Sequence, residues 1–189
     1  RTIEETAGGK VSYDGDGVLV LDASASTSAY ARVLLPEYLD GFGDIKITAK
    51  LKIDAAKNTK RWASVMLRVQ TANNYPYMQI CLRSSASLAN GTEIAERTTA
   101  NKWNVTQKAS SSINSSEYNT LTADASGSEI VYLINGKTQL TESAVTYVTG
   151  ACGFQANGCR LTVDEVTVTV GKVKSTDGKR TGAFADVRD

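Results

Sequence analysis

The amino-acid sequence predicts an all-β fold, a two-sheet antiparallel jelly-roll sandwich. Many short segments alternate polar and apolar residues, the pattern of strands with one buried face. Turn signals such as Asn135-Gly136 and Asn157-Gly158 recur between these segments, whereas a helical period is almost absent. A chain of 189 residues, 41% of them hydrophobic, can bury a core in one such domain without disulfide staples. We therefore expect a single sandwich domain over residues 1–170.

The N-terminal part of the chain is expected to form three short strands, Lys10–Tyr13, Val18–Ala23 and Ala29–Leu35. The run Asp14-Gly15-Asp16-Gly17 separates the first two strands because these residues favour turns. Pro36 ends the third strand, since proline cannot donate a backbone hydrogen bond to a sheet.

The segment 44–53 shows the clearest alternation, with apolar residues at the odd positions and polar residues at the even ones. This pattern predicts a strand with one buried and one wet face. The row of Lys46, Lys50 and Lys52 is interpreted as a solvated outer face rather than a binding patch.

Segments 62–70 and 75–83 alternate in the same way, and each is expected to form a strand. The side chains expected to face the core are Val65, Leu67, Val69, Met78, Ile80 and Leu82. The opposite faces are expected to hold Met66, Arg68, Gln70, Tyr77, Gln79, Cys81 and Arg83. Such a mixture of planar amphipathic groups and amides suits the hydroxyls and rings of sugars.

Residues 84–117 form a long polar stretch, in which we expect one or two irregular strands around Ile94 and residues 103–105. Loops of this length in a compact domain are usually functional or disordered. Trp103 stands out in this stretch. Two interpretations remain open: an anchor that packs the loop on the sheet, or a platform on which a sugar ring stacks.

The C-terminal part continues with expected strands at Tyr118–Ala123, Glu129–Ile134 and Thr138–Leu140, the last two joined by Asn135-Gly136. A further hairpin is predicted around Asn157-Gly158, because both central residues of a type I′ turn need φ > 0. The register that follows pairs Ala156 with Cys159, Gln155 with Arg160 and Phe154 with Leu161. It places Gln155 and Arg160 together on one face of the sheet.

Beyond Val163 the apolar alternation changes phase, so one extra residue at Asp164-Glu165 predicts a β-bulge. After Val170 the sequence is charged and turn-rich, without strong alternation. Residues 171–189 are therefore expected to be a linker to a further domain of a longer protein.

Composition excludes several classes of function. The net charge of +1 gives no support for a nucleic-acid partner or an anionic membrane surface, and no apolar run is long enough for membrane insertion. The sequence has no histidine, which excludes Ser-His-Asp and Cys-His catalysis and disfavours a structural zinc site. Its three cysteines, Cys81, Cys152 and Cys159, are expected to be buried free thiols that act as small hydrophobic residues.

Several motifs occur in the order found in one known superfamily. They are 42–51 (FGDIKITAKL), 65–68 (VMLR), 118–121 (YNTL), 133–136 (LING), 153–158 (GFQANG) and 163–166 (VDEV). Over about residues 10–170 the chain resembles the concanavalin A-like lectin/glucanase superfamily, near its laminin-G-like and 3-keto-disaccharide hydrolase-type domains. By its tail and overall style, the chain also resembles an accessory domain of bacterial surface enzymes, such as a glycerophosphodiester phosphodiesterase.

The resemblance implies a concave sheet on which ligands often sit, and it places Arg68 and Gln155 there. Combined with the strand registers, this predicts one ligand-binding surface with two aromatic residues at its rim. The surface residues are Arg68, Tyr77, Gln79, Gln155 and Arg160, and the rim residues are Tyr75 and Trp103. The alternative is a polar network that merely fills a groove.

The resemblance also implies a structural Ca²⁺, although no cofactor is expected to be required. Asp14, Asp16 and Asp164 offer hard oxygen ligands of the kind that Ca²⁺ accepts. The alternative is that these carboxylates cap local backbone amides in turns.

The paired carboxylates of glycosidases in this superfamily, a Glu-x-Asp-x-x-Glu pattern, are missing from the sequence. Glu93 and Glu96 are three apart and would point to opposite sides of a strand, while Asp164 and Glu165 lie in the expected bulge. The sequence therefore predicts a non-catalytic carbohydrate-binding or adhesion module of a larger extracellular bacterial protein, secreted or at the cell surface. The alternatives are a glycan-cleaving enzyme whose carboxylates escape recognition, and a structural or protein-binding spacer whose groove the 84–117 loop blocks.

Overall fold

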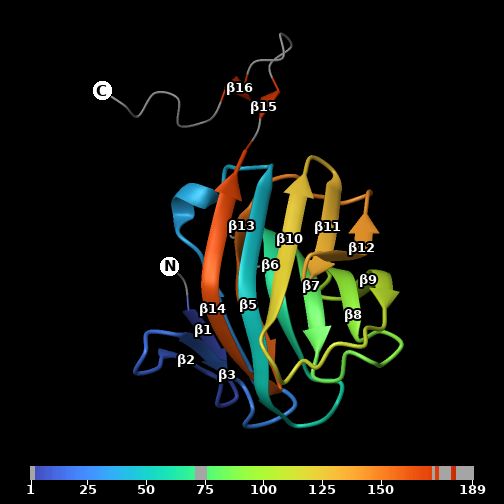
Figure 1. Cartoon of the computed structure of the whole chain (residues 1–189). Helices are drawn as coiled ribbons and strands as arrows, with labels where there is room; N and C mark the ends of the chain where they lie inside the picture. Colours follow the sequence, from blue (N-terminus) through green and yellow to red (C-terminus); the bar gives the residue numbers. More distant parts are fainter. Residues whose placement is uncertain (1–2, 71–75, 172, 175–179, 182–189) are drawn as a thin grey trace.

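The computed structural model describes residues 3–70, 76–171, 173–174 and 180–181. It is a sandwich of two antiparallel seven-stranded sheets, here called sheet A and sheet B (Figure 1). Sheet A consists, in spatial order, of β1 (Ile3–Thr6), β4 (Tyr30–Leu34), β13 (Ala151–Asn157), β6 (Trp62–Val69), β7 (Tyr77–Arg83), β8 (Thr92–Arg97) and β9 (Trp103–Ala109). Sheet B consists of β12 (Lys137–Glu142), β11 (Glu129–Ile134), β10 (Asn119–Ser126), β5 (Ile45–Ala56), β14 (Cys159–Val170), β3 (Leu19–Asp22) and β2 (Lys10–Tyr13). The all-β jelly-roll prediction is confirmed.

Few regular elements of the described chain lie outside these two sheets. One 3-10 turn, η1 (Glu37–Leu39), follows β4 directly after Pro36. Two short strands, β15 (Val173–Lys174) and β16 (Arg180–Thr181), pair with each other beyond the end of the sandwich (Figure 1). No helix among the described residues has the length and apolar character needed to cross a membrane.

The core lies between the two sheets, and β5 shows how the sequence builds it. The apolar residues at its odd positions, from Ile45 to Ile53, are all buried. The three lysines on its opposite face pair with acidic side chains: Lys46 with Asp124 at 2.9 Å, Lys50 with Glu165 at 2.6 Å and Lys52 with Asp54 at 2.9 Å. The predicted solvated lysine face is therefore confirmed.

The predicted N-terminal strands form β2, β3 and β4 with ends shifted by at most one residue. The sequence did not predict β1, which pairs with β4 at the edge of sheet A. Its residues, Ile-Glu-Glu-Thr, are half-buried to exposed, because an edge strand with little apolar surface carries little periodic signal.

The two Asn-Gly signals have different outcomes. Asn135 and Gly136 take φ values of 51° and 77°, and Ile134 pairs with Lys137, so the predicted hairpin between β11 and β12 is confirmed. The hairpin predicted at Asn157-Gly158 is wrong. There β13 belongs to sheet A and β14 to sheet B, and of the two turn residues only Gly158 has a positive φ, 62°.

The strand partners around this turn differ accordingly. Ala156 pairs with Ala31 and Ala63 rather than with Cys159, whose partner is Ala56 of β5. Phe154 and Leu161, on either side of the turn, are both fully buried in the core. The predicted apolar alternation is therefore confirmed, but it is the same whether two strands share one sheet or face each other across the core.

Among the register shifts in the two sheets, two bulges bear on the predicted faces. The predicted bulge in β14 is confirmed, because the pairing with β5 shifts between Asp164 and Thr167 and Glu165 has a φ of 47°. A second bulge, which the sequence did not predict, lies in β6. Its pairing with β13 shifts between Ala151 and Gly153, and Arg68 takes a φ of 56°.

Candidate functional site

A pocket of about 210 Å³ opens on the outer face of sheet A, away from the core. It is lined by Tyr30, Arg32, Trp62, Tyr77, Arg97, Trp103, Gln155 and Asn157. These residues come from six strands of the sheet, β4, β6, β7, β8, β9 and β13. The strand registers explain their convergence, because Arg32 lies opposite Gln155 and Arg97 lies opposite both Tyr77 and Trp103.

Three aromatic rings form one wall of the pocket. The ring centroid of Trp103 lies 5.9 Å from that of Trp62 and 5.8 Å from that of Tyr77. The interplanar angles of 82° and 86° are the edge-to-face geometry that aromatic quadrupoles favour. Trp103 keeps 43% of its surface exposed, so part of this wall remains accessible to a ligand.

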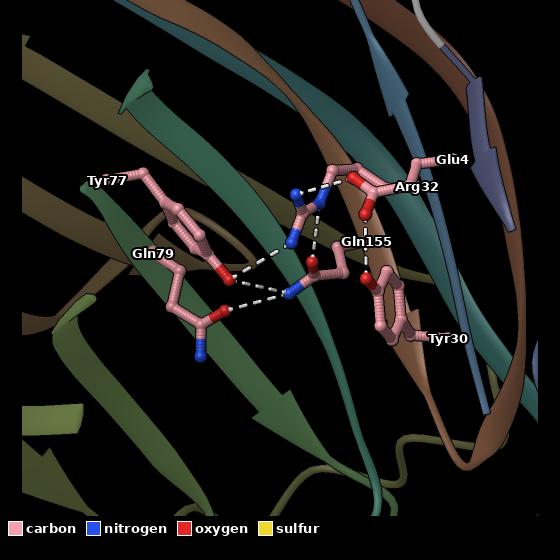
Figure 2. Close-up of polar contacts among 6 residues, drawn as sticks. All are labelled: Glu4, Tyr30, Arg32, Tyr77, Gln79 and Gln155. Carbon is pink, nitrogen blue, oxygen red and sulfur yellow. Dashed lines mark hydrogen bonds and ion pairs between the residues drawn. The ribbon is translucent and has the colours of Figure 1, made fainter. Parts of the chain in front are cut away.

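A buried polar network forms the floor (Figure 2). Arg32 donates from Nε to Oε1 of Gln155 at 2.7 Å. The amide nitrogen of Gln155 donates to the hydroxyl of Tyr77 at 3.2 Å and to Oε1 of Gln79 at 3.5 Å. Because Arg32, Gln79 and Gln155 are each at most 6% exposed, their mutual hydrogen bonds compensate the cost of removing them from water.

The edge strand β1 contributes one carboxylate next to this floor. Glu4 accepts a hydrogen bond from Arg32 Nη1 at 2.9 Å and another from the Tyr30 hydroxyl at 2.7 Å (Figure 2). The Glu4 side chain is 41% exposed, whereas that of Arg32 is 8% exposed. The ion pair therefore lies at the margin between the buried floor and solvent.

The pocket carries positive charge at two places. The guanidinium of Arg32 lies 5.2 Å from the ring centroid of Tyr77, and that of Arg97 lies 4.9 Å from the centroid of Trp103. Arg97 also donates a hydrogen bond to the side chain of Asn101. The described lining residues include these two arginines, and the charge of Arg32 is balanced by its ion pair with Glu4 beside the pocket.

The structure brings together four of the residues predicted to bind ligand. Tyr77, Trp103 and Gln155 line the pocket, and Gln79 lies directly beneath it in contact with Gln155. Tyr75, the second predicted rim residue, lies outside the described residues.

Arg68 does not share this face, which corrects the predicted surface. Its side chain is 2% exposed and donates from Nη2 to the carbonyl oxygens of Gly127 at 2.6 Å and Gly43 at 3.3 Å. Both acceptors belong to the end of sheet B. The unpredicted bulge in β6 adds a residue and so turns Arg68 toward the other sheet. Burial lowers the pKa of Arg68, while the charge of nearby Asp44 opposes that shift.

Arg160 also lies elsewhere, on the outer face of sheet B. It pairs with Asp22 at 3.5 Å and with Asp54 at 3.6 Å. The error follows from the wrong hairpin: Gln155 and Arg160 would share a face only if β13 and β14 were hydrogen-bonded to each other.

Sequence reasoning missed five lining residues, Tyr30, Arg32, Trp62, Arg97 and Asn157. A partial signal existed for Tyr30 and Arg32, which alternate with Ala31 and Val33 in the predicted strand 29–35. That alternation separates the two faces, but it does not reveal that this strand lies beside Gln155. The neighbour relation is a property of sheet order, which local patterns do not encode.

The predicted calcium ligands make local contacts. Oδ1 of Asp14 accepts the backbone N–H groups of Asp16 at 3.0 Å and Val18 at 2.9 Å, and Oδ1 of Asp164 accepts that of Glu165 at 2.8 Å. Within the part of the chain that the structure describes, no three His, Cys, Asp or Glu side chains gather as a metal site would require. These contacts match the capping alternative, and the calcium site stays a prediction.

The glutamates closest to a catalytic pattern are also separated. Glu93 lies opposite Cys81 on the outer side of β8, is 4% exposed, and pairs with Arg83 at 3.0 Å. Glu96 lies opposite the core residue Met78 and therefore points to the other side of the sheet. The predicted separation of the two carboxylates is confirmed.

Comparison with known proteins identifies the fold. No protein-family profile matches the sequence, and no curated protein matches it either. The structure is similar to the carbohydrate-binding module CBM66 from Bacillus subtilis, with a TM-score of 0.68, 11% identity, and coverage of 88% of this chain and 94% of that one. It is also similar to a Bacillus subtilis protein of unknown function with a galectin-like fold, with a TM-score of 0.67, 16% identity, and coverage of 89% and 88%.

A β-1,3-glucanase from Mycobacterium marinum is similar as well, with a TM-score of 0.58, 14% identity, and coverage of 89% of this chain and 90% of that one. At such low identities the similarity concerns the fold. The chain has a jelly-roll sandwich of the galectin-like and concanavalin A-like kind, as the sequence motifs implied.

Proposed function

We propose that this chain is a non-catalytic carbohydrate-binding or adhesion module that holds a sugar in the pocket of sheet A. The observation that carries the proposal is the combination of an aromatic wall, the half-buried Trp62 and the exposed Trp103, with the Arg32–Gln155 floor. A flat ring can stack on the C–H face of a sugar, while guanidinium and amide groups can bracket its hydroxyls. The similar fold of a protein described as a carbohydrate-binding module agrees with this function.

The composition of the pocket favours binding over cleavage. Glycoside hydrolysis needs two carboxyl groups about 5–9.5 Å apart across the scissile bond. None of the described lining residues is an Asp or Glu, and the nearest acidic group, Glu4, is held by Arg32 and Tyr30.

The module would act within a larger extracellular bacterial protein, where it would keep a partner enzyme domain close to glycan. A glycerophosphodiester phosphodiesterase remains the predicted candidate for that partner. Secretion or display at the cell surface stays part of the same proposal.

A glycan array followed by incubation of each hit with the protein tests the proposal. We expect binding without the appearance of new reducing ends. Cleavage would support the enzyme alternative instead, and silence across a broad array would support the spacer.

The site itself is tested by Trp103→Ala, with Tyr13→Ala as the matched control. Tyr13 is 71% exposed and belongs to β2 in sheet B, so it offers a similar loss of aromatic surface away from the pocket. Calorimetric titration with an array hit should show about 5–100-fold weaker binding for Trp103→Ala, as expected when one stacking ring is lost. Equal affinities for the two variants would place the ligand elsewhere.

A further inference from the structure

The edge strand β1 lies beside the pocket of sheet A, and we infer that Glu4 in this strand is a positioning residue of the site. It fixes the side chains of Tyr30 and Arg32 for a sugar ligand without lining the pocket itself. This inference rests on the proposed function, since it assigns a further residue to the same site.

Each oxygen of the Glu4 carboxylate holds a different side chain of the pocket (Figure 2). Oε2 accepts a hydrogen bond from Nη1 of Arg32 at 2.9 Å, and Oε1 accepts one from the hydroxyl of Tyr30 at 2.7 Å. Both donors line the pocket, whereas Glu4 does not. The guanidinium carbon of Arg32 also lies 5.4 Å from the ring centroid of Tyr30, so the three side chains form a closed cluster.

The pairing of β1 with β4 explains this double contact. Glu4 lies directly opposite Arg32, and Thr6 lies opposite Tyr30, so Tyr30 is a diagonal neighbour of Glu4. Diagonal neighbours on antiparallel strands are farther apart than a directly opposite pair, but they remain within reach of long side chains. Glutamate is long enough to contact both neighbours at once, whereas aspartate is one methylene shorter.

The same contact fixes the direction of the Arg32 guanidinium. Its Nε donates to Gln155 at 2.7 Å and its Nη2 to the hydroxyl of Tyr77 at 3.5 Å, while Glu4 holds the third nitrogen, Nη1. The guanidinium is thereby held from three strands, β13, β7 and β1. Of these three partners Glu4 alone carries a charge opposite to that of Arg32, so it also compensates the guanidinium for its burial.

Side chains that are already fixed favour binding, because the ligand does not have to order them. Association otherwise pays for each flexible side chain that becomes immobile at the interface. Without Glu4, the ligand would have to order the hydroxyl of Tyr30 and one arm of Arg32 itself. We therefore expect Glu4→Ala to weaken glycan binding about 5–50-fold.

Thermodynamic linkage requires the reverse effect as well. If the contacts of Glu4 favour the binding of a glycan, the bound glycan favours the docked position of β1 by the same free energy. Because β1 is an edge strand that pairs with β4, hydrogen exchange of its amides reports this docking. We expect a saturating glycan to slow exchange in residues 3–6 of the wild-type protein and to have little effect there in Glu4→Ala.

Three variants at Glu4 separate its reach from its charge. The probe is the glycan with the strongest signal on the array, and the fluorescence of Trp62 and Trp103, the two tryptophans of the chain, reports its binding because both line the pocket. In Glu4→Gln the amide oxygen can accept from Arg32 and the amide nitrogen can donate to Tyr30, so we expect affinity within about threefold of the wild type. Glu4→Asp keeps the charge but loses the reach, and we expect it to bind as weakly as Glu4→Ala.

Glu5→Ala is the matched control. Glu5 lies in the same strand and accepts the backbone N–H of Val11 in β2 at 2.6 Å, so this variant also removes one carboxylate and one contact of β1. Glu5 lies opposite the core residue Ala31 and therefore on the face of sheet A away from the pocket. We expect its affinity to equal that of the wild type within about twofold. Urea denaturation verifies that each variant is folded.

Equal binding by Glu4→Ala and the wild type would overturn the inference while leaving a glycan-binding function in place. Affinity that follows charge, with Glu4→Asp like the wild type and Glu4→Gln much weaker, would also overturn it, and this comparison holds even if Glu4→Ala does not fold. Equal losses in Glu4→Ala and Glu5→Ala would do the same, since Glu4 would then act only by docking β1. If no glycan binds the wild-type protein, the proposed function itself fails, and the inference fails with it.

Discussion

Arg68 illustrates how one residue departs from a predicted face. The alternation of β6 assigns it to the outer face of sheet A together with Met66. A bulge gives it a φ of 56°, a conformation that glycine adopts without strain and other residues rarely adopt. Its guanidinium then links β6 to backbone carbonyls at the end of sheet B, so its role is to hold the two sheets together at that end.

The backbone conformation of Arg68 can be tested with the pair Arg68→Gly and Arg68→Ala. Both variants lose the hydrogen bonds to Gly43 and Gly127, so their difference isolates the backbone. We expect Arg68→Gly to be more stable than Arg68→Ala by about 1 kcal/mol, because only Ala pays for the positive φ. Urea denaturation measures this difference, and the reverse order would argue against the bulge.

At the scale of the element, β13 is the strand on which the site is built. It lies between β4 and β6, and it places Gln155 opposite both Arg32 and Ser64. Gly153 allows the close approach of its neighbours, since a Cβ there would lie 2.0 Å from the carbonyl oxygen of Val33. The pairing of β13 with β4, which sets Gln155 beside Arg32 in the pocket floor, therefore depends on Gly153.

Gly153→Ala is expected to destabilise the fold by about 1–3 kcal/mol or more, because the obstacle is backbone that cannot rotate away. Gly15→Ala is the control: no atom lies within 4 Å of a Cβ at that turn position, and we expect a change within about 0.5 kcal/mol. Chemical denaturation of the two variants gives both values. A Gly153→Ala protein as stable as the control would show that β4 and β13 are farther apart than described.

At the scale of the molecule, the sandwich excludes all three cysteines from solvent. Cys81, Cys152 and Cys159 form no disulfide within the described part of the chain and are at most 1% exposed, as the sequence predicted for buried thiols. Burial raises the pKa of Cys159 to about 12 and raises that of Cys81 well above its ordinary range. Thiolates react whereas thiols do not, so the folded protein should be inert to thiol reagents near neutral pH.

Ellman's reagent at pH 8 should label no thiol in the native protein and three in urea, where the thiol pKa returns to about 8.5. The three thiols should become reactive together, because a single domain that unfolds cooperatively exposes all of its strands at once. A thiol that reacts rapidly without denaturant would mean that its strand opens locally.

The sequence alone determined the all-β architecture and, within a strand, which side chains face the core. Alternation identified the strands of the sandwich apart from the edge strand β1 and the strands β8 and β9, which were expected only as irregular strands in the polar stretch 84–117. Strand β5 shows why alternation suffices elsewhere: its apolar side chains reach the same core whatever its neighbours are. Alternation also placed Tyr77 and Gln79 on the outer face and Met78 in the core. Face assignment is local, because it depends only on the period of the strand.

The tertiary structure alone decided which strands are neighbours, and therefore which residues form the site. The Asn157-Gly158 turn joins two sheets instead of two strands of one sheet, which removes Arg160 from the face of Gln155 and brings Arg32 beside it. The bulge in β6 removes Arg68 in the same way. Strand order and bulges arise from long-range packing of the whole chain, and the same local sequence is compatible with either arrangement until that packing is formed.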